Sequence, residues 1–287
     1  MFFLPLFDEN PSHRVPIITW LIMAVCIGVF FYQATLHPQD AFIFVKSYGA
    51  IPSLVTGVEL RSFTLADIPN EATLVTSMFM HGGWLHLAGN MLYLWIFGDN
   101  IEDSFGRVKF ILFYLACGVA ATLTHILIAP ASSVPLVGAS GAIAGILAAY
   151  LLLFPHAQVR VIVIILIFIR WLSFPAIVIL AGWMIVQFIS APASLLGDGG
   201  GVAYFAHIGG FVAGLILTPF FKRRHQPFFA GKPKSMPMHL TDAANPFAGT
   251  NRQRSGRKPS RNAFLDRYRP QDKNKDQGRN DGRGPWG

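Results

Sequence analysis

Long stretches without charged residues constrain this chain more than any other feature of its sequence. Among its 287 residues there are five intervals of 23 to 50 residues that contain no Asp, Glu, Lys or Arg. The intervals are residues 15–39, 72–98, 110–159, 171–197 and 199–221. A helix needs about 20 apolar residues to cross the hydrocarbon layer of a bilayer, which is about 30 Å thick. The intervals therefore predict a helical protein that crosses a membrane several times.

The longest interval, 110–159, has room for two crossings. Pro130 and Pro135 enclose small and polar residues in its middle, and because proline ends helices they predict a turn there. We therefore predict an all-α membrane protein with six transmembrane helices. The expected spans lie near residues 16–36, 80–98, 108–128, 139–154, 173–190 and 202–221.

The charges divide the chain into two unlike parts. Residues 222–287 hold 16 Lys and Arg and 5 Asp and Glu, a net charge of +11, whereas residues 1–221 hold 7 and 10, a net charge of −3. This division excludes a uniformly basic globule that binds nucleic acid. We expect a short N-terminus, 1–15, a six-span domain, 16–221, and a basic tail, 222–287. The tail is rich in Gly, Pro, Asn, Gln, Lys and Arg, which predicts disorder.

The basic residues also predict the orientation, since Lys and Arg are retained in cytoplasmic loops. With the N-terminus inside, most of them fall on the cytoplasmic side, including the whole tail. Both termini are therefore expected in the cytoplasm, and the long connection 37–79 outside it. The first span has no basic segment before it, so we expect it to remain uncleaved. The tail's charge favours contact with anionic lipid.

Polar residues at the ends of the predicted spans carry the first functional signal, because ionisable groups in hydrocarbon are costly. The second span opens with the sequence HGGWLHLAGN, which contains His81, His86 and Asn90. His86 and Asn90 are four residues apart and therefore share one helix face, while His81 lies at or just before the helix start. Three polar side chains thus gather at the outer end of this span.

Ser140, in the sequence GASG, opens an unusually short fourth span. The 14 residues from Gly141 to Phe154 would extend about 21 Å, at about 1.5 Å per residue, so the helix begins below the outer membrane surface. A serine at a helix start is most often a cap. At a submerged helix start, beside free backbone N–H groups, it is also placed to act as a nucleophile.

His207, in the sequence AHIGG, lies early in the sixth span. It has two readings: a hydrogen-bonding residue between helices, or a base. Gly141 and Gly145 on the fourth span are spaced as Gly210 and Gly214 are on the sixth, a pattern that lets two helices approach closely. If these faces meet, Ser140 and His207 come within hydrogen-bond reach.

These three motifs, in this order, resemble those of the rhomboid intramembrane serine proteases. The resemblance covers about residues 10–221 and includes Glu102 and Gly106, which are similar to the family's Glu-x-x-x-Gly signature. The chain departs from many members in having no Trp-Arg pair in the 37–79 connection. The resemblance implies a six-helix fold in a bacterial cytoplasmic (inner) membrane. It also implies substrates that are themselves membrane proteins, with a single-pass type expected.

The resemblance also implies roles at the matching positions. Ser140 would attack the peptide carbonyl, and His207 would take up and return its proton. His86, Asn90 and the backbone N–H of Ser140 would stabilise the oxyanion, with His81 in support. Gly138 and Gly141 flank the serine and would let a substrate backbone come close, since glycine has no Cβ.

Other residues suggest no further chemistry. No carboxylate is placed to orient His207, which indicates a dyad rather than a triad. No cofactor or metal is expected, because the sequence lacks His-Glu-x-x-His. Cys26 and Cys117 are expected to be buried, and His125 to pack between helices. Gln187 could either pack or face the water that hydrolysis requires, and Arg170 and Trp171 are expected at the inner membrane interface.

Two alternatives to a protease remain. One is an inactive rhomboid-like protein that binds membrane-protein clients; such relatives lose the nucleophile or the base, whereas both Ser140 and His207 are present here. The other is an unrelated six-span transporter, which predicts internal repeats that the sequence does not show.

Overall fold

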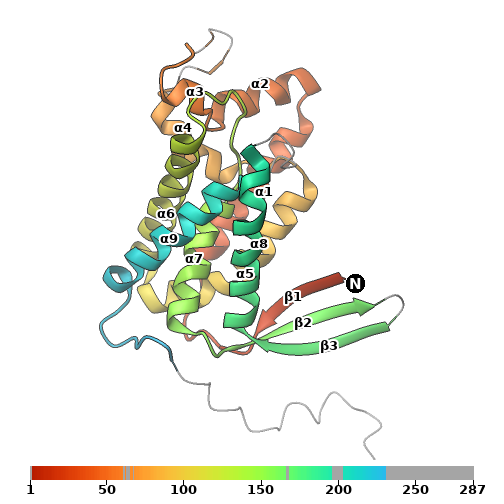
Figure 1. Ribbon diagram of the computed structural model, residues 1–287, viewed down its shortest axis with the longest axis vertical. Coiled ribbons are helices and arrows are strands. Elements are labelled where there is room, and N and C mark those ends of the chain that lie inside the picture. The colour runs from red at the N-terminus through yellow and green to blue at the C-terminus, as the bar shows by residue number, and fades with distance from the viewer. Residues whose placement is uncertain are drawn as a thin grey trace, which may run out of the picture. The chain divides into compact units, whose positions relative to one another are not determined.

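The computed structural model describes residues 2–60, 62, 65–66, 68–165, 168–195 and 203–230. The disorder expected for the tail falls mostly on residues 231–287, which lie outside the described residues. All described residues belong to one compact unit, 1–235, which is mainly helical (Figure 1).

Each predicted span overlaps one helix of the structure. The helices are α1 (Ile17–Thr35), α5 (Trp84–Phe105), α6 (Arg107–Ile128), α7 (Ser140–Leu153), α8 (Ala176–Leu195) and α9 (Tyr204–Phe221). Among the described residues, four of them, α1, α6, α8 and α9, are long and apolar enough to cross a membrane. In contrast, α5 carries acidic residues near its end, and α7 has only 14 residues. The chain is therefore a membrane protein with several apolar helices, and the count of six spans stays a prediction.

The long connection before α5 is folded into short helices. These are α2 (Pro38–Tyr48), α3 (Pro52–Val55), the 3₁₀ turn η1 (Asn70–Ala72), α4 (Thr73–Thr76) and the 3₁₀ turn η2 (Ser77–Phe79). Its backbone is tied to the loop before α7, because Ala50 and Leu136 exchange two backbone hydrogen bonds of 3.0 and 2.8 Å. The connection therefore packs against the segment that leads into Ser140.

A three-stranded antiparallel sheet corrects the all-α prediction. Its strands are β1 (Phe2–Asp8), β2 (Gln158–Ile165) and β3 (Phe168–Pro175), with β2 in the middle. The charge-free intervals treated residues 155–172 as a loop between two spans. Valine and isoleucine, which favour strands, dominate β2, and its Val159, Val161 and Val163 are all buried on one face. Burial along β2 thus alternates with a period of two, which a count of charges alone cannot detect.

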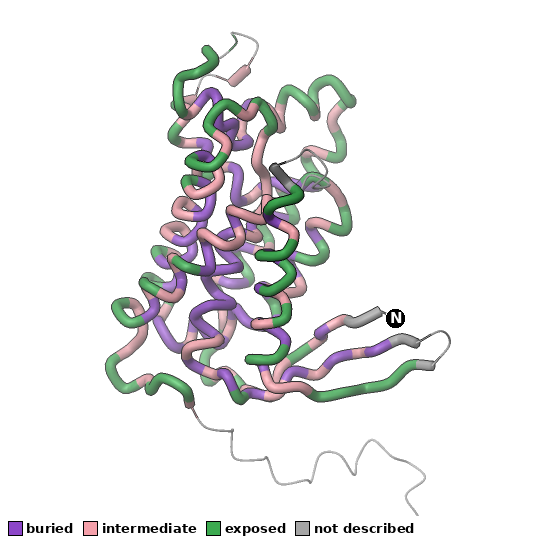
Figure 2. The backbone as a smooth tube through the Cα atoms, viewed as in Figure 1, coloured by how far each residue is buried: buried purple, intermediate pink, exposed green. Residues whose placement is uncertain are grey.

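Helix α7 lies at the centre of the helical unit (Figure 2). Eleven of its 14 residues are buried, and it packs against α5, α6 and α9. Its contact with α9 depends on glycine: a Cβ on Gly210 would collide with the carbonyl oxygen of Gly141, and one on Gly214 would lie 2.5 Å from the carbonyl oxygen of Gly145. The predicted close approach of these two glycine faces is therefore confirmed. Because α7 begins at Ser140, this packing also sets the position of the serine.

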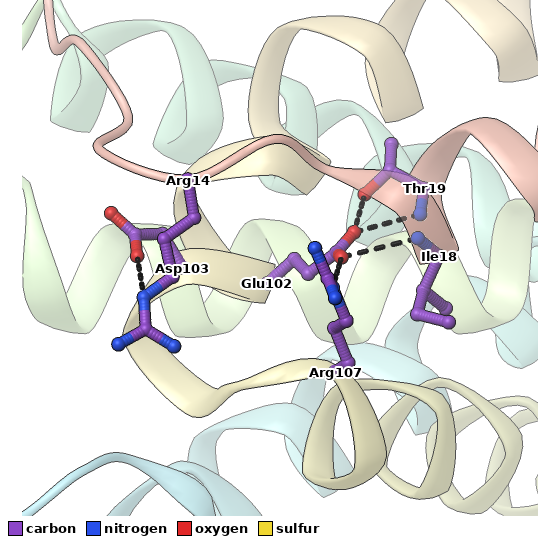
Figure 3. Close-up of polar contacts among 6 residues, drawn as sticks. All are labelled: Arg14, Ile18, Thr19, Glu102, Asp103 and Arg107. Atoms are coloured by element: carbon purple, nitrogen blue, oxygen red, sulfur yellow. Dashed lines mark hydrogen bonds and ion pairs between the residues drawn. The ribbon is translucent and has the colours of Figure 1, made fainter.

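At the opposite end of the unit, Glu102 links α1 to α5 (Figure 3). Its carboxylate accepts hydrogen bonds from the backbone N–H of Ile18 at 3.1 Å, and from the backbone N–H and hydroxyl of Thr19, both at 2.8 Å. The first N–H groups of a helix lack partners within the helix, so a carboxylate there satisfies them and interacts favourably with the helix dipole. Arg107 lies 4.0 Å from the same carboxylate.

Candidate active site

Ser140 and His207 meet at the junction of α7 and α9. Ser140 is the first residue of α7, and His207 lies in the first turn of α9. The Oγ atom of Ser140 is 2.8 Å from Nε2 of His207, which is hydrogen-bond distance. The glycine contacts between the two helices bring their backbones close enough for this bond. The predicted proximity of the two side chains is therefore observed, whereas their catalytic roles stay predictions.

Gln187, on α8, holds the other side of the His207 ring. Its Oε1 is 2.7 Å from Nδ1 of His207, and its Nε2 donates to the carbonyl oxygen of Trp183 at 3.3 Å. Since the amide nitrogen is directed to Trp183, the amide oxygen accepts from His207, and Nδ1 of that ring carries the hydrogen. Nε2 is then free to accept the hydrogen of the Ser140 hydroxyl. This tautomer is the one that a general base requires.

The sequence did not reveal this role of Gln187. The amide was expected either to pack or to face water, yet it is 5% exposed and orients the imidazole. It stands 20 residues before His207, on a different helix, and only the packing of α8 against α9 brings the two together. No local spacing in the sequence signals this contact.

His86 lies on the other side of Ser140, near the loop that precedes α7. The backbone N–H of Gly82 donates to Nδ1 of His86 at 3.3 Å, so Nε2 carries the hydrogen and is available as a donor. Gly138 has a φ of +130°, and a Cβ built on it would lie 2.7 Å from Nε2 of His86 and 3.6 Å from Oγ of Ser140. Position 138 therefore requires glycine for two reasons: its positive φ, and the close approach of the His86 ring. Without a side chain there, space remains between the two polar atoms.

Asn90 and His81 are buried with unused hydrogen-bonding atoms. Among the described residues, Nδ2 of Asn90 and both ring nitrogens of His81 have no partner. Asn90 is 7% exposed and His81 fully buried, and the His81 ring packs edge-on against His86 with centroids 5.2 Å apart. Buried polar groups are nearly always paired, so each exception needs an explanation. The oxyanion-binding role expected for Asn90 would provide one, and it stays a prediction.

Gly141 is placed differently from Gly138. A Cβ on Gly141 would lie 2.5 Å from Cβ of Ala121 on α6, so its missing side chain makes room for a neighbouring helix. The substrate-approach role expected for Gly141 therefore stays a prediction, beside a packing reason that the structure supplies.

A small cavity of about 30 Å³ opens beside Ser140. That volume is enough for about one or two water molecules, since one water needs roughly 10–15 Å³ by this measure. Small side chains or none at all form much of the lining, including those of Gly118, Ala121, Gly138, Ala142 and Ala206. A group that enters this cavity from a bound chain must therefore be small.

The described part of the chain contains no cluster of side chains that could bind a metal ion. No group of three or more His, Cys, Asp and Glu side chains is arranged there to hold an ion. His125, on α6, lies apart from this site in the contacts described, and its Nδ1 has no partner among the described residues.

The fold and the site define a mainly helical membrane protein with a Ser–His pair at the start of a buried helix. The family model described as "Rhomboid domain" matches residues 70–224, more than half of the chain. This chain belongs to the rhomboid family.

Relatives from several sources are similar over parts of the chain. "Rhomboid-like protein 11, chloroplastic" of Arabidopsis thaliana is 30% identical over 220 residues, which cover 74% of this chain and 67% of that protein. "Rhomboid protein 1, mitochondrial" of Saccharomyces cerevisiae is 31% identical over 153 residues, 52% of this chain and 41% of the relative. "Rhomboid protease GluP" of Bacillus subtilis is 41% identical over 78 residues, 27% and 15% of the two chains. The matched part of the chain thus covers less than half the length of two of these three relatives.

Proposed function

We propose that this protein is an intramembrane serine endopeptidase that cleaves peptide bonds in or near the transmembrane segments of other membrane proteins. The observation that carries the proposal is the 2.8 Å hydrogen bond between Oγ of Ser140 and Nε2 of His207. Membership of a family in which a relative is named a protease supports it further. The bound segment is expected to come from a single-pass protein.

Ser140 attacks the carbonyl carbon of the scissile bond while its proton passes to Nε2 of His207. The tetrahedral oxyanion accepts hydrogen bonds from Nε2–H of His86, the side-chain amide of Asn90 and the backbone N–H of Ser140, with His81 packed behind His86. The C–N bond then breaks as His207 returns the proton to the leaving amine. Water then attacks the acyl carbon while its proton passes to His207. The bond between that carbon and Oγ of Ser140 breaks, His207 returns the proton to Oγ, and the second product leaves with its new carboxyl group.

The cavity beside Ser140 bears on specificity. Because it holds only about 30 Å³ and about half of its lining residues are glycine or alanine, we expect small residues at the bond that is cut. The protein's own lipid environment is its other partner, with the basic tail on anionic lipid. We expect both termini in the cytoplasm, in a bacterial cytoplasmic membrane, although two of the relatives compared above are named as mitochondrial and chloroplastic.

Labelling with a serine-directed fluorophosphonate tests the proposal. The wild-type protein in detergent should be labelled and should cut a model transmembrane substrate in vesicles. Ser140→Ala should abolish both activities, and His207→Ala should lower cleavage by at least about 10³-fold, because the hydroxyl loses its base. Ser133→Ala, at an exposed loop serine, is the matched control and should leave both unchanged.

The inactive rhomboid-like protein is the second candidate. Its distinguishing result is a folded wild-type protein that captures a membrane-protein client but neither reacts with the fluorophosphonate nor cleaves. Full cleavage by Ser140→Ala would instead overturn the dyad itself.

A further inference from the structure

One face of the sheet carries a cluster of large apolar side chains, most of them exposed. The pairing of β1, β2 and β3 puts Phe7, Ile162, Ile169 and Trp171 on the face opposite the buried valines of β2; we call these four residues the bare face. Phe7 is 47%, Ile169 61% and Trp171 55% exposed, and the rings of Phe7 and Trp171 lie 6.4 Å apart. Water-exposed surfaces rarely keep such a cluster of large apolar side chains bare without a partner.

The position of the sheet beside an apolar helix indicates what could cover the bare face. The strands extend sideways from the helices at the end where α7 stops and α8 begins (Figure 1). β3 ends at Pro175 and α8 starts at the next residue, Ala176, so the sheet is joined directly to a helix that is apolar enough to span a membrane. The first turn of α8 exposes Ile177 and Val178. The bare face is therefore followed along the chain by exposed apolar side chains of a helix that is apolar enough to span a membrane.

The charged residues of the sheet are compatible with a lipid surface next to the bare face. Arg160 is on the same side of β2 as the bare face, but its guanidinium is paired with the carboxylate of Glu9. Arg170 occupies the other face of edge strand β3 and is exposed. A long basic side chain near an apolar surface extends its charged end toward lipid headgroups and water. Tryptophan is also enriched at this depth of a membrane.

The backbone sets how deep the sheet can lie. β1 and β3 are the edge strands, and their outward N–H and C=O groups need water or headgroups as partners. Open sheet edges do not occur in the hydrocarbon region. We propose that the bare face lies on the bilayer in which the protein is embedded, at the headgroup boundary of the leaflet opposite the Ser140 end. In this position β1 and the β2–β3 hairpin form an interfacial platform beside the start of α8.

Spin-label accessibility in vesicles of phosphatidylcholine and phosphatidylglycerol tests this position. A nitroxide is attached to Ile169→Cys in the full chain; the two native cysteines, Cys26 and Cys117, are buried. His156→Cys, in the exposed turn before β2, is the aqueous control, and Ile185→Cys, on the exposed face of α8, is the lipid control. Collisions with oxygen report apolar surroundings, and collisions with a water-soluble nickel chelate report water.

We expect the label at 169 to collide with the nickel chelate several-fold less often than the label at 156, and to lie at a shallower depth than the label at 185. Trp171→Cys should give the same result and serves if Ile169→Cys does not fold. Nickel access equal to that at 156 would overturn the proposal. A second result would also overturn it: a label at 169 that neither oxygen nor the nickel chelate reaches, with dipolar broadening between the labels of two molecules. That result would mean that a second copy of the chain covers the bare face. The readout does not depend on catalysis, so it stands or falls separately from the proposed protease activity.

Discussion

The two ends of the helical unit differ in whether their buried polar groups have hydrogen-bond partners. Around Glu102, which is 4% exposed, the carboxylate accepts three hydrogen bonds from the start of α1. Around Ser140, the amide nitrogen of Asn90 and both ring nitrogens of His81 have no partner among the described residues. A buried group that is paired stabilises the fold, whereas an unpaired one costs free energy. We therefore expect the paired groups around Glu102 to hold the structure, and the unpaired groups around Ser140 to serve a bound ligand.

Two buried asparagines on α5 test this difference most directly. Asn90 has a free amide nitrogen, while Asn100 donates to the carboxylate of Asp8 at 3.1 Å and accepts from Asn10 at 2.6 Å. We expect Asn90→Ala to lower kcat about 10²- to 10³-fold, a loss of about 3–4 kcal/mol of transition-state stabilisation, without lowering thermal stability. Asn100→Ala should do the reverse. Cleavage kinetics in vesicles and thermal unfolding in detergent measure both, and equal effects of the two changes would contradict the comparison.

Glu102→Ala should give the largest loss of stability at the paired end. It leaves the backbone N–H groups of Ile18 and Thr19 and the hydroxyl of Thr19 without their acceptor, so we expect a loss of about 2–3 kcal/mol in the free energy of unfolding. Asp103→Ala is the matched control, because Asp103 accepts one exposed hydrogen bond, from the backbone N–H of His13 at 2.8 Å, and pairs with an exposed Arg14 at 3.7 Å. Exposed ion pairs contribute less than about 1 kcal/mol, so we expect a smaller loss than for Glu102→Ala. The rate per folded molecule should be unchanged in both. A large fall in that rate would show that Glu102 acts on the site.

Gln187 lies at the Ser140 end but contacts His207 and not Ser140 in the hydrogen bonds described, so we expect a smaller effect on the rate. Gln187→Leu removes the acceptor for Nδ1–H of His207 and leaves the ring free to turn. We expect kcat to fall about tenfold, about 1.4 kcal/mol, with KM unchanged. Gln187→Glu should restore most of the rate, because a carboxylate oxygen accepts the same hydrogen bond. If the glutamate variant is as slow as the leucine variant, the side chain has a packing role only.

The sequence predicted the helices and the Ser140–His207 contact for reasons that the structure explains. Charge-free intervals locate the helices because lipid excludes unpaired charge, and the matched glycines at 141, 145, 210 and 214 predict the close approach of α7 and α9. The sheet was missed because its two arginines marked residues 155–172 only as a break between spans. Gln187 was missed because its partner lies on another helix. Both depend on contacts between distant segments, which local patterns do not encode.

Asp8 provides the smallest test, since it is a partly buried titratable group near the Glu102 end of the helical unit. Its carboxylate, in β1, accepts hydrogen bonds from the hydroxyl of Tyr150 and the amide of Asn100. Burial, reinforced by the negative charge of Asp99, raises the pKa of Asp8 from 3.8 to about 7 despite those bonds. Between these two pH values the folded chain keeps a proton that the unfolded chain has lost. Stability should therefore fall as the pH rises from about 4 to about 7 and level off above that.

The expected loss is about 1 kcal/mol, well below the limit set by the full shift, because Asp8 is partly exposed and water stabilises its charge. Thermal unfolding of the detergent-solubilised protein at several pH values between 4 and 8 measures it. Asp8→Asn is the control: it keeps the shape and cannot ionise, so this part of the pH dependence should disappear while cleavage continues. If the wild type and Asp8→Asn lose stability in parallel across this range, the titrating group lies elsewhere. The strand β1 would then be docked onto α5 and α7 by hydrogen bonds that are insensitive to pH.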